Sequence, residues 1–240
     1  NESGNTVFSH FYSENSPSGM TSNNGIVGGK GNCFFVAGNT YDSITGKNIT
    51  TLKYSYPFYW LVIHYSLEGP QSAFPYGFQD TIRVYIRNSA SPYNILDSSK
   101  GVNEYSSFLV FMYVYSYFEN ASSSGTYYLV LKHRNSIETW SRPAQLFSNV
   151  YPNFNFTDSA AKAYGSNQKL LTATPFNLYG FYSGDVNQDG TIDVTDNGLI
   201  DNDAFNFKSG YLASDLNGDG LVDLTDGVFA DNNAFNFVSK

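Results

Sequence analysis

Short apolar stretches of period two run through the first three quarters of the chain. In the range 81–87, Ile82, Val84 and Ile86 alternate with residues that tolerate water. This is expected of a strand with one face on a core and the other in solvent. The range 126–133 alternates in the same way, whereas 58–65 is almost wholly apolar. The latter pattern predicts a strand that is buried on both faces.

Further stretches rich in Tyr, Phe, Val and Ile are separated by clusters of Gly, Ser, Asn and Pro, which favour turns. The range 13–32 is expected to be a long loop or a pair of turns, and 120–125 to join two strands as a hairpin. No convincing helical period precedes Asp185. The pattern therefore predicts a mainly β fold, with a two-sheet sandwich of about ten strands. The remaining strands are expected at 6–12, 32–37, 49–55, 108–117, 138–141, 145–147, 154–156, 169–174 and 177–182.

The last quarter of the chain has a different pattern, which occurs twice. The segment 185–196 places oxygen-bearing side chains at positions 1, 3, 5, 9 and 12 of a twelve-residue loop. That is the spacing of a calcium loop, in which Gly190 at position 6 allows the sharp turn and Thr191 offers its carbonyl. Ile192 at position 8 is expected to point into the core.

The same pattern returns 30 residues later in the segment 215–226, and the likeness extends from 201–207 to 231–237. A single loop of this kind could be a polar surface turn. Two copies with matching ligands, glycines and tails indicate an internal duplication and predict two bound calcium ions.

Paired loops with Asp in place of Glu at position 12, each followed by one short helix, resemble the type I dockerin repeats of secreted bacterial proteins. The resemblance covers the range from near Ser183 to Lys240. Carried over residue by residue, it implies a first site made of Asp185, Asn187, Asp189, the Thr191 carbonyl, Asp193 through a water molecule, and Asp196. The second site would consist of Asp215, Asn217, Asp219, the Leu221 carbonyl, Asp223 and Asp226.

Partner recognition does not carry over from this family. Dockerins that bind cohesins typically have a small polar pair after the ninth loop position and basic residues along the helix. Here those pairs are Val194-Thr195 and Leu224-Thr225, and the helices that follow are acidic and rich in Asn. The resemblance therefore implies calcium binding without implying a cohesin partner.

The segments 125–140 and 156–165 resemble a β-sandwich module found directly before dockerin-like repeats in bacterial secreted and surface proteins. The range 126–133 is also similar to prealbumin-like sandwiches, whereas the first 75 residues resemble no family. Such a module implies a surface role and no chemistry. We expect a jelly-roll or prealbumin-like sandwich over residues 1–182, divided near 75–80 if it has two subdomains, and a dockerin-like domain over 183–240.

Composition and charge favour an extracellular or cell-surface location. Of its 240 residues 41% are hydrophobic and 18% aromatic, which is enough for a core. The net charge of -8 comes from residue 183 onward, where 11 Asp and 2 Lys give -9; this disfavours nucleic acid as a partner. The single cysteine, Cys33, excludes an internal disulfide, so calcium would take over the role of a staple in an extracellular or cell-surface setting.

Two further features agree with that setting. No apolar run is long enough to span a bilayer. The chain opens on a polar segment without a signal peptide, as a mature secreted chain would.

Candidate catalytic groups are few. The histidines are His10, His64 and His133, all within strand patterns; His64 fits a hydrogen-bonded core residue and Cys33 a buried thiol. The best polar constellation is the range 133–135 with Glu138, but charges that fix a loop at a strand end explain it equally well. We therefore expect no enzymatic activity.

Aromatic and asparagine residues suggest glycan contacts of two kinds. A row of tyrosines could stack on sugars, although such rows more often form core and cross-strand pairs. These tyrosines are Tyr54, Tyr56, Tyr59, Tyr113, Tyr115 and Tyr117. Candidate glycosylation acceptors are Asn1, Asn48, Asn120 and Asn155.

The leading functional hypothesis is a non-catalytic, calcium-stabilised structural or adhesive subunit of a bacterial surface assembly or extracellular filament. The alternative is a dockerin-type connector that carries a carbohydrate-binding sandwich into a larger assembly, and a hydrolase fragment comes third. Another surface protein or a second copy of the chain would be the partner. In the second case the strand expected at 6–12 would be donated to a neighbour to build a polymer.

Overall fold

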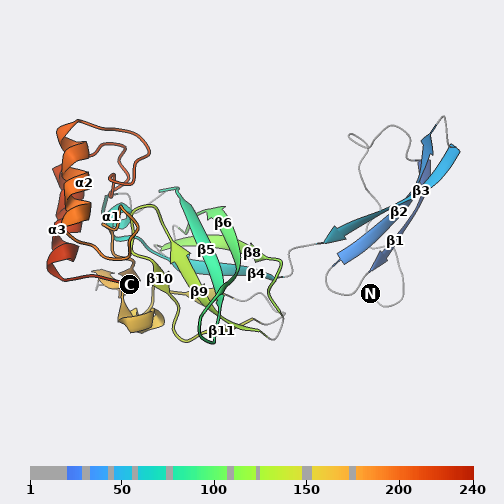
Figure 1. The fold of residues 1–240 in the computed structure, drawn as a ribbon, viewed down its shortest axis with the longest axis horizontal. Coiled ribbons are helices and arrows are strands. Elements are labelled where there is room, and N and C mark those ends of the chain that lie inside the picture. Colours follow the sequence, from blue (N-terminus) through green and yellow to red (C-terminus); the bar gives the residue numbers. More distant parts are fainter. Residues whose placement is uncertain are drawn as a thin grey trace. The chain divides into compact units, whose positions relative to one another are not determined.

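The computed structural model describes residues 21–28, 33–42, 46–55, 59–73, 78–106, 111–122, 125–147, 153–172 and 177–240. The fold is mainly β, with 39% of residues in strands and with sheets that do not close, which confirms the prediction of a mainly β chain. Two compact units divide the chain, Asn1–Phe58 and Tyr59–Lys240 (Figure 1). The position near Ser183, where the two sequence repeats begin, lies inside the second unit.

The first unit contains a three-stranded antiparallel sheet in the order β1-β2-β3. Its strands are β1 (Thr21–Gly28), β2 (Cys33–Asp42) and β3 (Gly46–Ser55). The expectation of a loop over 13–32 is wrong where β1 forms. The Ser, Asn and Gly residues of β1 favour turns, but pairing with β2 provides hydrogen bonds that local preference does not predict. The strand expected at 6–12 lies outside the described residues.

The second unit contains two larger sheets. One has the order β10-β9-β5-β6 with β11 also paired to β9, and the other has the order β12-β4-β8-β7. The first consists of β5 (Thr81–Asn88), β6 (Ile95–Val102), β9 (Thr126–Lys132), β10 (Thr139–Trp140) and β11 (Gln145–Leu146). The second consists of β4 (Tyr59–Tyr65), β7 (Glu104–Ser106), β8 (Phe111–Phe118) and β12 (Asn153–Asn155).

The core draws on both sheets. Ile82, Val84 and Ile86 of β5 are fully buried, so the alternation predicted for this strand is confirmed. In β4 only one face is fully buried, because Val62 and His64 are half-buried. The prediction of two buried faces is wrong here: the ring of His64 instead stacks on Phe111 at 4.7 Å between centroids, on the partly covered face.

The hairpin predicted around residues 120–125 is also wrong. β8 pairs with β4 and β7, whereas β9 pairs with β5, β10 and β11, so the connection passes from one sheet to the other. Asp97 of β6 contacts this connection, since its carboxylate accepts hydrogen bonds from the backbone N–H groups of Glu119 (2.8 Å) and Asn120 (2.9 Å). A side chain of the other sheet thus binds the start of the turn.

Three short helices and a small sheet precede the repeats, and the sequence reading missed the helices. They are α1 (Glu68–Ala73), η1 (Ala160–Lys162) and η2 (Tyr164–Ser166). The two-stranded sheet consists of β13 (Lys169–Thr172) and β14 (Leu178–Gly180). Among the described residues, none of the helices is long and apolar enough to cross a membrane.

The repeats supply two helices that lie side by side, α2 (Val194–Phe205) and α3 (Leu224–Phe235) (Figure 1). Ile200 and Ala230 of these helices pack with Leu216 and Val222 of the second loop segment. Ile192 is 1% exposed, as predicted for loop position 8. It packs with Val238 and with Ile137, which follows β9, so the repeats share a core with the β part of the unit.

Candidate functional site

The first repeat folds as a loop whose side chains accept its own backbone N–H groups. Asp185 Oδ2 accepts from Gly190 N at 3.2 Å. Asn187 Oδ1 accepts from Asp189 N at 2.8 Å, and Asp189 Oδ1 accepts from Thr191 N at 2.9 Å. These bonds hold the side chains at positions 1, 3 and 5 against the loop, which fixes their oxygens before any ligand binds.

The second repeat has the same bonds at equivalent positions. Asp215 Oδ2 accepts from Gly220 N at 3.2 Å, Asn217 Oδ1 from Asp219 N at 2.8 Å, and Asp219 Oδ1 from Leu221 N at 2.8 Å. Position 6 has the predicted positive φ in both loops, with 93° in the first and 85° in the second. The duplication seen in the sequence is therefore a duplication of local structure as well.

The Asp side chains at position 12 connect each loop to its helix. Asp196 is fully buried, and its Oδ1 accepts from Val186 N (2.9 Å) and Asn187 N (3.1 Å), while its Oδ2 accepts from Asp193 N (3.1 Å). Asp226 makes the equivalent three bonds in the second repeat. The position 12 carboxylate is thus placed next to the start of its own loop.

The side chains at position 9 have another role in this structure. Asp193 and Asp223 are the N-caps of α2 and α3, and each accepts a hydrogen bond of 2.7 Å from the backbone N–H two residues later. Together with position 12 they form capping boxes. In each loop the side chains at positions 1, 3, 5 and 12 therefore accept backbone hydrogen bonds of the loop, and position 9 begins the helix.

Asp185 has an unpartnered oxygen. The residue is 1% exposed, and its Oδ1 is buried without a hydrogen-bond partner among the described residues. Burial raises the pKa of Asp185 to about 6; the bond from Gly190 opposes that rise, and the charges of Asp196 and Asp189 add to it. A buried carboxylate oxygen with no partner is costly, and a cation at that point would remove the cost.

Burial likewise raises the pKa of the other carboxyls at positions 1 and 12, Asp196, Asp215 and Asp226. The candidate metal ligands in the loops are carboxylate, amide and carbonyl oxygens, which suit a hard cation such as Ca²⁺. Among the described residues, however, no three His, Cys, Asp or Glu side chains form a group close enough to hold a metal. The residues fit calcium by their chemistry and by the unpartnered Asp185 oxygen.

The segment that follows β9 binds the backbone of the second loop. Arg134 Nη1 and Asn135 Nδ2 both donate to the backbone carbonyl of Asp215, at 3.0 and 2.8 Å. Arg134 Nε also donates to Asp80 Oδ2 at 2.8 Å, and Tyr211 donates its hydroxyl to Asp80 Oδ1 at 2.5 Å. The first position of the second loop, and the segment between α2 and that loop, are thereby fixed to the β part of the unit.

A second polar contact involves Glu68 at the start of α1. This carboxylate is 5% exposed and accepts hydrogen bonds from Asn233 Nδ2 (2.6 Å), from Ser183 N (3.1 Å) and from Lys169 Nζ. Asn233 belongs to α3, so α1 and the last helix are joined through a buried carboxylate. Buried charged contacts of this kind set one orientation between the packed parts.

The residues weighed for catalysis have structural contacts. His133 is 3% exposed and lies between Asn135 Oδ1 (2.9 Å) and Asp80 Oδ2 (3.0 Å). Glu138 is separate from this group; it accepts from Trp140 Nε1 at 2.8 Å and lies 3.7 Å from Lys132 Nζ. His10 and the side chain of Cys33 lie outside the described parts of the chain.

The tyrosine row is not a core row where its side chains are described. Tyr115 and Tyr117 of β8 are 38% and 50% exposed, and Tyr113 contacts Tyr115 edge to face at 5.8 Å. The expectation of core pairs is wrong for these side chains, since they occupy the outward positions of the strand. The side chains of Tyr54 and Tyr59, and all of Tyr56, lie outside what the structure describes.

The candidate glycosylation acceptors differ in accessibility. Asn120 is exposed. Asn155 is half-buried, and its Oδ1 accepts from both N and Oγ1 of Thr157 at 2.8 Å. Asn48 is a backbone member of β3, and Asn1 lies outside the described residues.

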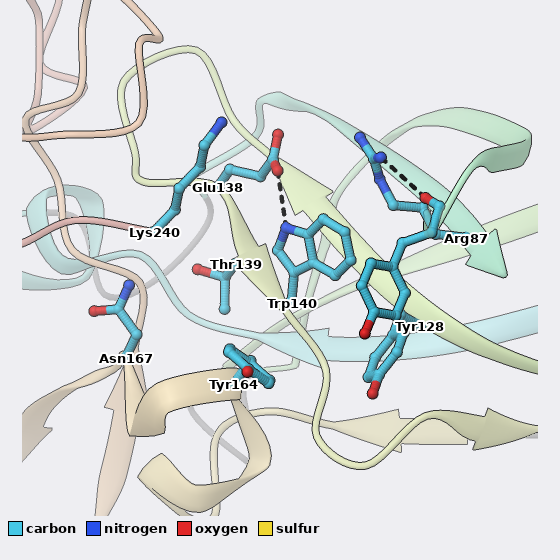
Figure 2. Close-up of a pocket in the computed structure, with 9 residues that line it drawn as sticks. Arg87, Tyr128, Glu138, Thr139, Trp140, Tyr164, Asn167 and Lys240 are labelled. Atoms are coloured by element: carbon cyan, nitrogen blue, oxygen red, sulfur yellow. Dashed lines mark hydrogen bonds between the residues drawn. The ribbon is translucent and has the colours of Figure 1, made fainter. Parts of the chain in front are cut away.

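Sequence reasoning missed two features of the surface. Four exposed phenylalanines follow the same plan in both repeats: Phe205 (82%), Phe207 (91%), Phe235 (83%) and Phe237 (88%). Their repetition at 201–207 and 231–237 was the available signal. The other feature is an aromatic pocket around Trp140 (Figure 2), which no spacing in the sequence could have revealed because its walls come from distant segments.

Comparison with known proteins found no match for this chain, either to a family model, to a curated protein or to a solved structure.

Proposed function

We propose that this chain is a non-catalytic, calcium-stabilised structural or adhesive protein of the extracellular space, a subunit of a surface assembly or filament. The observation that carries the proposal is the buried, unpartnered Oδ1 of Asp185 in a loop whose hydrogen bonds recur in the second repeat. Two Ca²⁺ ions would be held by the loop ligands at 185–196 and 215–226. Their positive charge would offset the acidity of the repeats.

In this proposal the two sheets of the second unit act as a β-sandwich, and the dockerin-like repeats act as its calcium-dependent brace. The contacts of Arg134 with the Asp215 carbonyl and of Glu68 with Asn233 support this role. Metal bound in the loops would stabilise the repeat residues that make those contacts. Calcium would therefore stabilise the β part as well as the repeats.

The exposed phenylalanines support a role in assembly. Phe207 and Phe237 have φ values of 50° and 54°, in the left-handed region that glycine normally occupies after a helix. An aromatic residue in this conformation is strained, and both side chains are about nine-tenths exposed. The presence of a strained, exposed phenylalanine at the same place in both repeats favours a contact with another protein.

The dockerin-type connector remains a second candidate, because the repeats resemble dockerins and the second unit has the Trp140 pocket described below. In that case the repeats would bind a receptor domain and the β part would bind carbohydrate. Mixing the purified chain with a panel of cohesin domains separates the candidates. A stable complex with any of them favours the connector.

Titration calorimetry with CaCl₂ on the full chain tests the calcium proposal. We expect two ions per chain, and one in Asp185→Asn, because the amide cannot supply the negative charge at position 1. Asp201→Asn, an exposed Asp of α2 outside the loops, should keep both. Thermal unfolding should show a gain of about 2.7 kcal/mol for each occupied site when free calcium is about 100 times the dissociation constant. No heat of binding and an unchanged melting temperature with excess EDTA would refute the proposal.

A further inference from the structure

A pocket of about 460 Å³ lies beside β10 (Figure 2). This volume is in the range of small-molecule sites in proteins. Its aromatic wall consists of Tyr93 from the turn after β5, Tyr128 from β9, Trp140 from β10 and Tyr164 from η2. Four segments separated in sequence thus place aromatic rings around one hollow.

Trp140 is held in place before any ligand arrives. Its Nε1 donates to Glu138 Oε1 at 2.8 Å, and the guanidinium of Arg87 lies over the indole with its carbon 4.8 Å from the ring centroid (Figure 2). Arg87 Nη1 in turn donates to the carbonyl of Tyr93 at 3.2 Å. A ring fixed on its edge and on one face loses little freedom on binding, which favours affinity.

The rings meet at steep angles. Tyr93 makes angles of 78° with Tyr128 and 88° with Trp140, and Tyr128 is tilted by 56° against Trp140, all with centroids 5.8–6.3 Å apart. Among these three rings no two are parallel, so none form a slot for a flat ligand such as a nucleobase. A cup of angled rings with hydroxyl tips suits a puckered ring that has C–H groups on its faces and hydroxyls on its edge.

The charges of the lining decide the sign of the ligand. Arg87 and Lys240 are cationic, and the carboxylate of Glu138 is engaged by Trp140 and lies 3.7 Å from Lys132 Nζ. The cationic side chains of Arg87 and Lys240 outnumber Glu138, the one acidic side chain among the residues of the lining. A cationic ligand would meet like charge, whereas a carboxylate would meet a complementary surface.

The exposed fraction of the aromatic side chains distinguishes a binding site from ordinary core packing. Tyr164 is 66% exposed and Tyr93 is 41% exposed, although both line the same hollow as the fixed indole. Rings that served only to pack the sheets would be covered. We propose that the Trp140 pocket binds a saccharide and prefers a sugar that carries a carboxylate.

Ligand-observed NMR and calorimetry test this with three probes: trigalacturonic acid, neutral galactotriose and adenosine monophosphate. We expect the acidic trisaccharide to bind more tightly than the neutral one, and adenosine monophosphate to bind most weakly. Tyr164→Ala should lose about tenfold in affinity, the equivalent of about 1.4 kcal/mol, through the lost stacking surface. Leu170→Ala, at an exposed apolar position of β13 outside the pocket lining, is the control.

Two more variants separate charge from stacking. Lys240→Gln should reduce the preference for the acidic sugar while leaving the neutral sugar nearly unaffected, whereas Arg87→Gln also removes the contact over the indole and should weaken the binding of both sugars. Unchanged circular dichroism and melting temperature in Tyr164→Ala, whose side chain is mostly exposed, show that folding is intact. Failure of both sugars to bind, equal affinity in Tyr164→Ala and the wild type, or tighter binding of adenosine monophosphate overturns the proposal.

Discussion

Arg134 Nη1 donates a hydrogen bond of 3.0 Å to the backbone carbonyl of Asp215. Arg134 follows β9, and Asp215 is the first residue of the second candidate calcium loop. Because Arg134 Nε also binds the carboxylate of Asp80 at 2.8 Å, one side chain fixes the loop and neutralises a buried acid. The β part and the repeats are therefore coupled through a side chain whose loss should be felt in both.

Replacing Arg134 with Met keeps most of the volume and removes the donors. We expect Arg134→Met to lower the free energy of unfolding by roughly 3 kcal/mol, the low end for breaking a buried ion pair, since His133 and Tyr211 still contact Asp80. Urea unfolding measures the loss. Arg83→Met, at an exposed position of β5, is the control and should change stability by less than about 0.5 kcal/mol. Equal small effects in the two variants would contradict the coupling.

Asp80 should make stability depend on acid pH. Burial alone raises the pKa of Asp80, but hydrogen bonds from His133, Tyr211 and Arg134 and the charge of His133 outweigh it, so that its pKa lies well below the usual range. A lowered pKa means that the stabilising contribution is fully present above the unfolded pKa of about 3.9 and is lost as pH falls toward the folded value.

The stability difference between wild type and Asp80→Asn isolates this contribution, because the other carboxyls titrate in both proteins. We expect the difference measured at about pH 5 to shrink as the pH falls below about 4. Urea unfolding across this range provides the measurement. A difference that grows as the pH falls would show that the carboxylate of Asp80 is not stabilised in the folded state.

Gly69 of α1 lies against the backbone of the second repeat. A Cβ at this position would be 2.0 Å from the carbonyl oxygen of Leu216, and backbone atoms cannot move aside cheaply. We expect Gly69→Ala to destabilise the chain by more than about 2 kcal/mol, as a clash in a packed site does. Gly198→Ala is the matched control: Gly198 is inside α2 with no atom within 4 Å of such a Cβ. It should gain up to about 1 kcal/mol from helix propensity.

The features that the sequence predicted correctly are those that depend on local spacing along the chain. The loops were found because the ligand positions, the glycine and the following helix are all local, within twelve residues. The strand at 81–87 was found because Ile82, Val84 and Ile86 all face one core. Both patterns depend only on spacing along the chain, which is the information a single sequence holds.

What was missed depends on distant partners. β6 has mostly half-buried or exposed side chains, so it shows no apolar alternation, and only pairing with β5 defines it. The turn after β8 has hairpin residues, but Asp97 of the other sheet binds its backbone. The hollow around Trp140 requires η2 to lie near β10, a relationship that no local pattern encodes.

The phenylalanines at the helix ends provide a test in which stability and function move in opposite directions. Phe207 and Phe237 have positive φ and almost fully exposed rings, so they contribute strain to the folded state and little packing. We expect Phe207→Gly with Phe237→Gly to raise the melting temperature, because glycine removes a strain of about 1 kcal/mol at each site.

If these rings contact a partner subunit, the same double variant should assemble less. Light scattering and negative-stain images with calcium present measure assembly of the wild type and the variant at equal concentration. Phe205→Ala with Phe235→Ala is the companion variant: it removes two exposed rings from helix positions without relieving backbone strain, so assembly should fall with no rise in melting temperature. If the glycine variant is more stable and assembles as well as the wild type, the retained strain has another cause and the phenylalanines are not the contact surface.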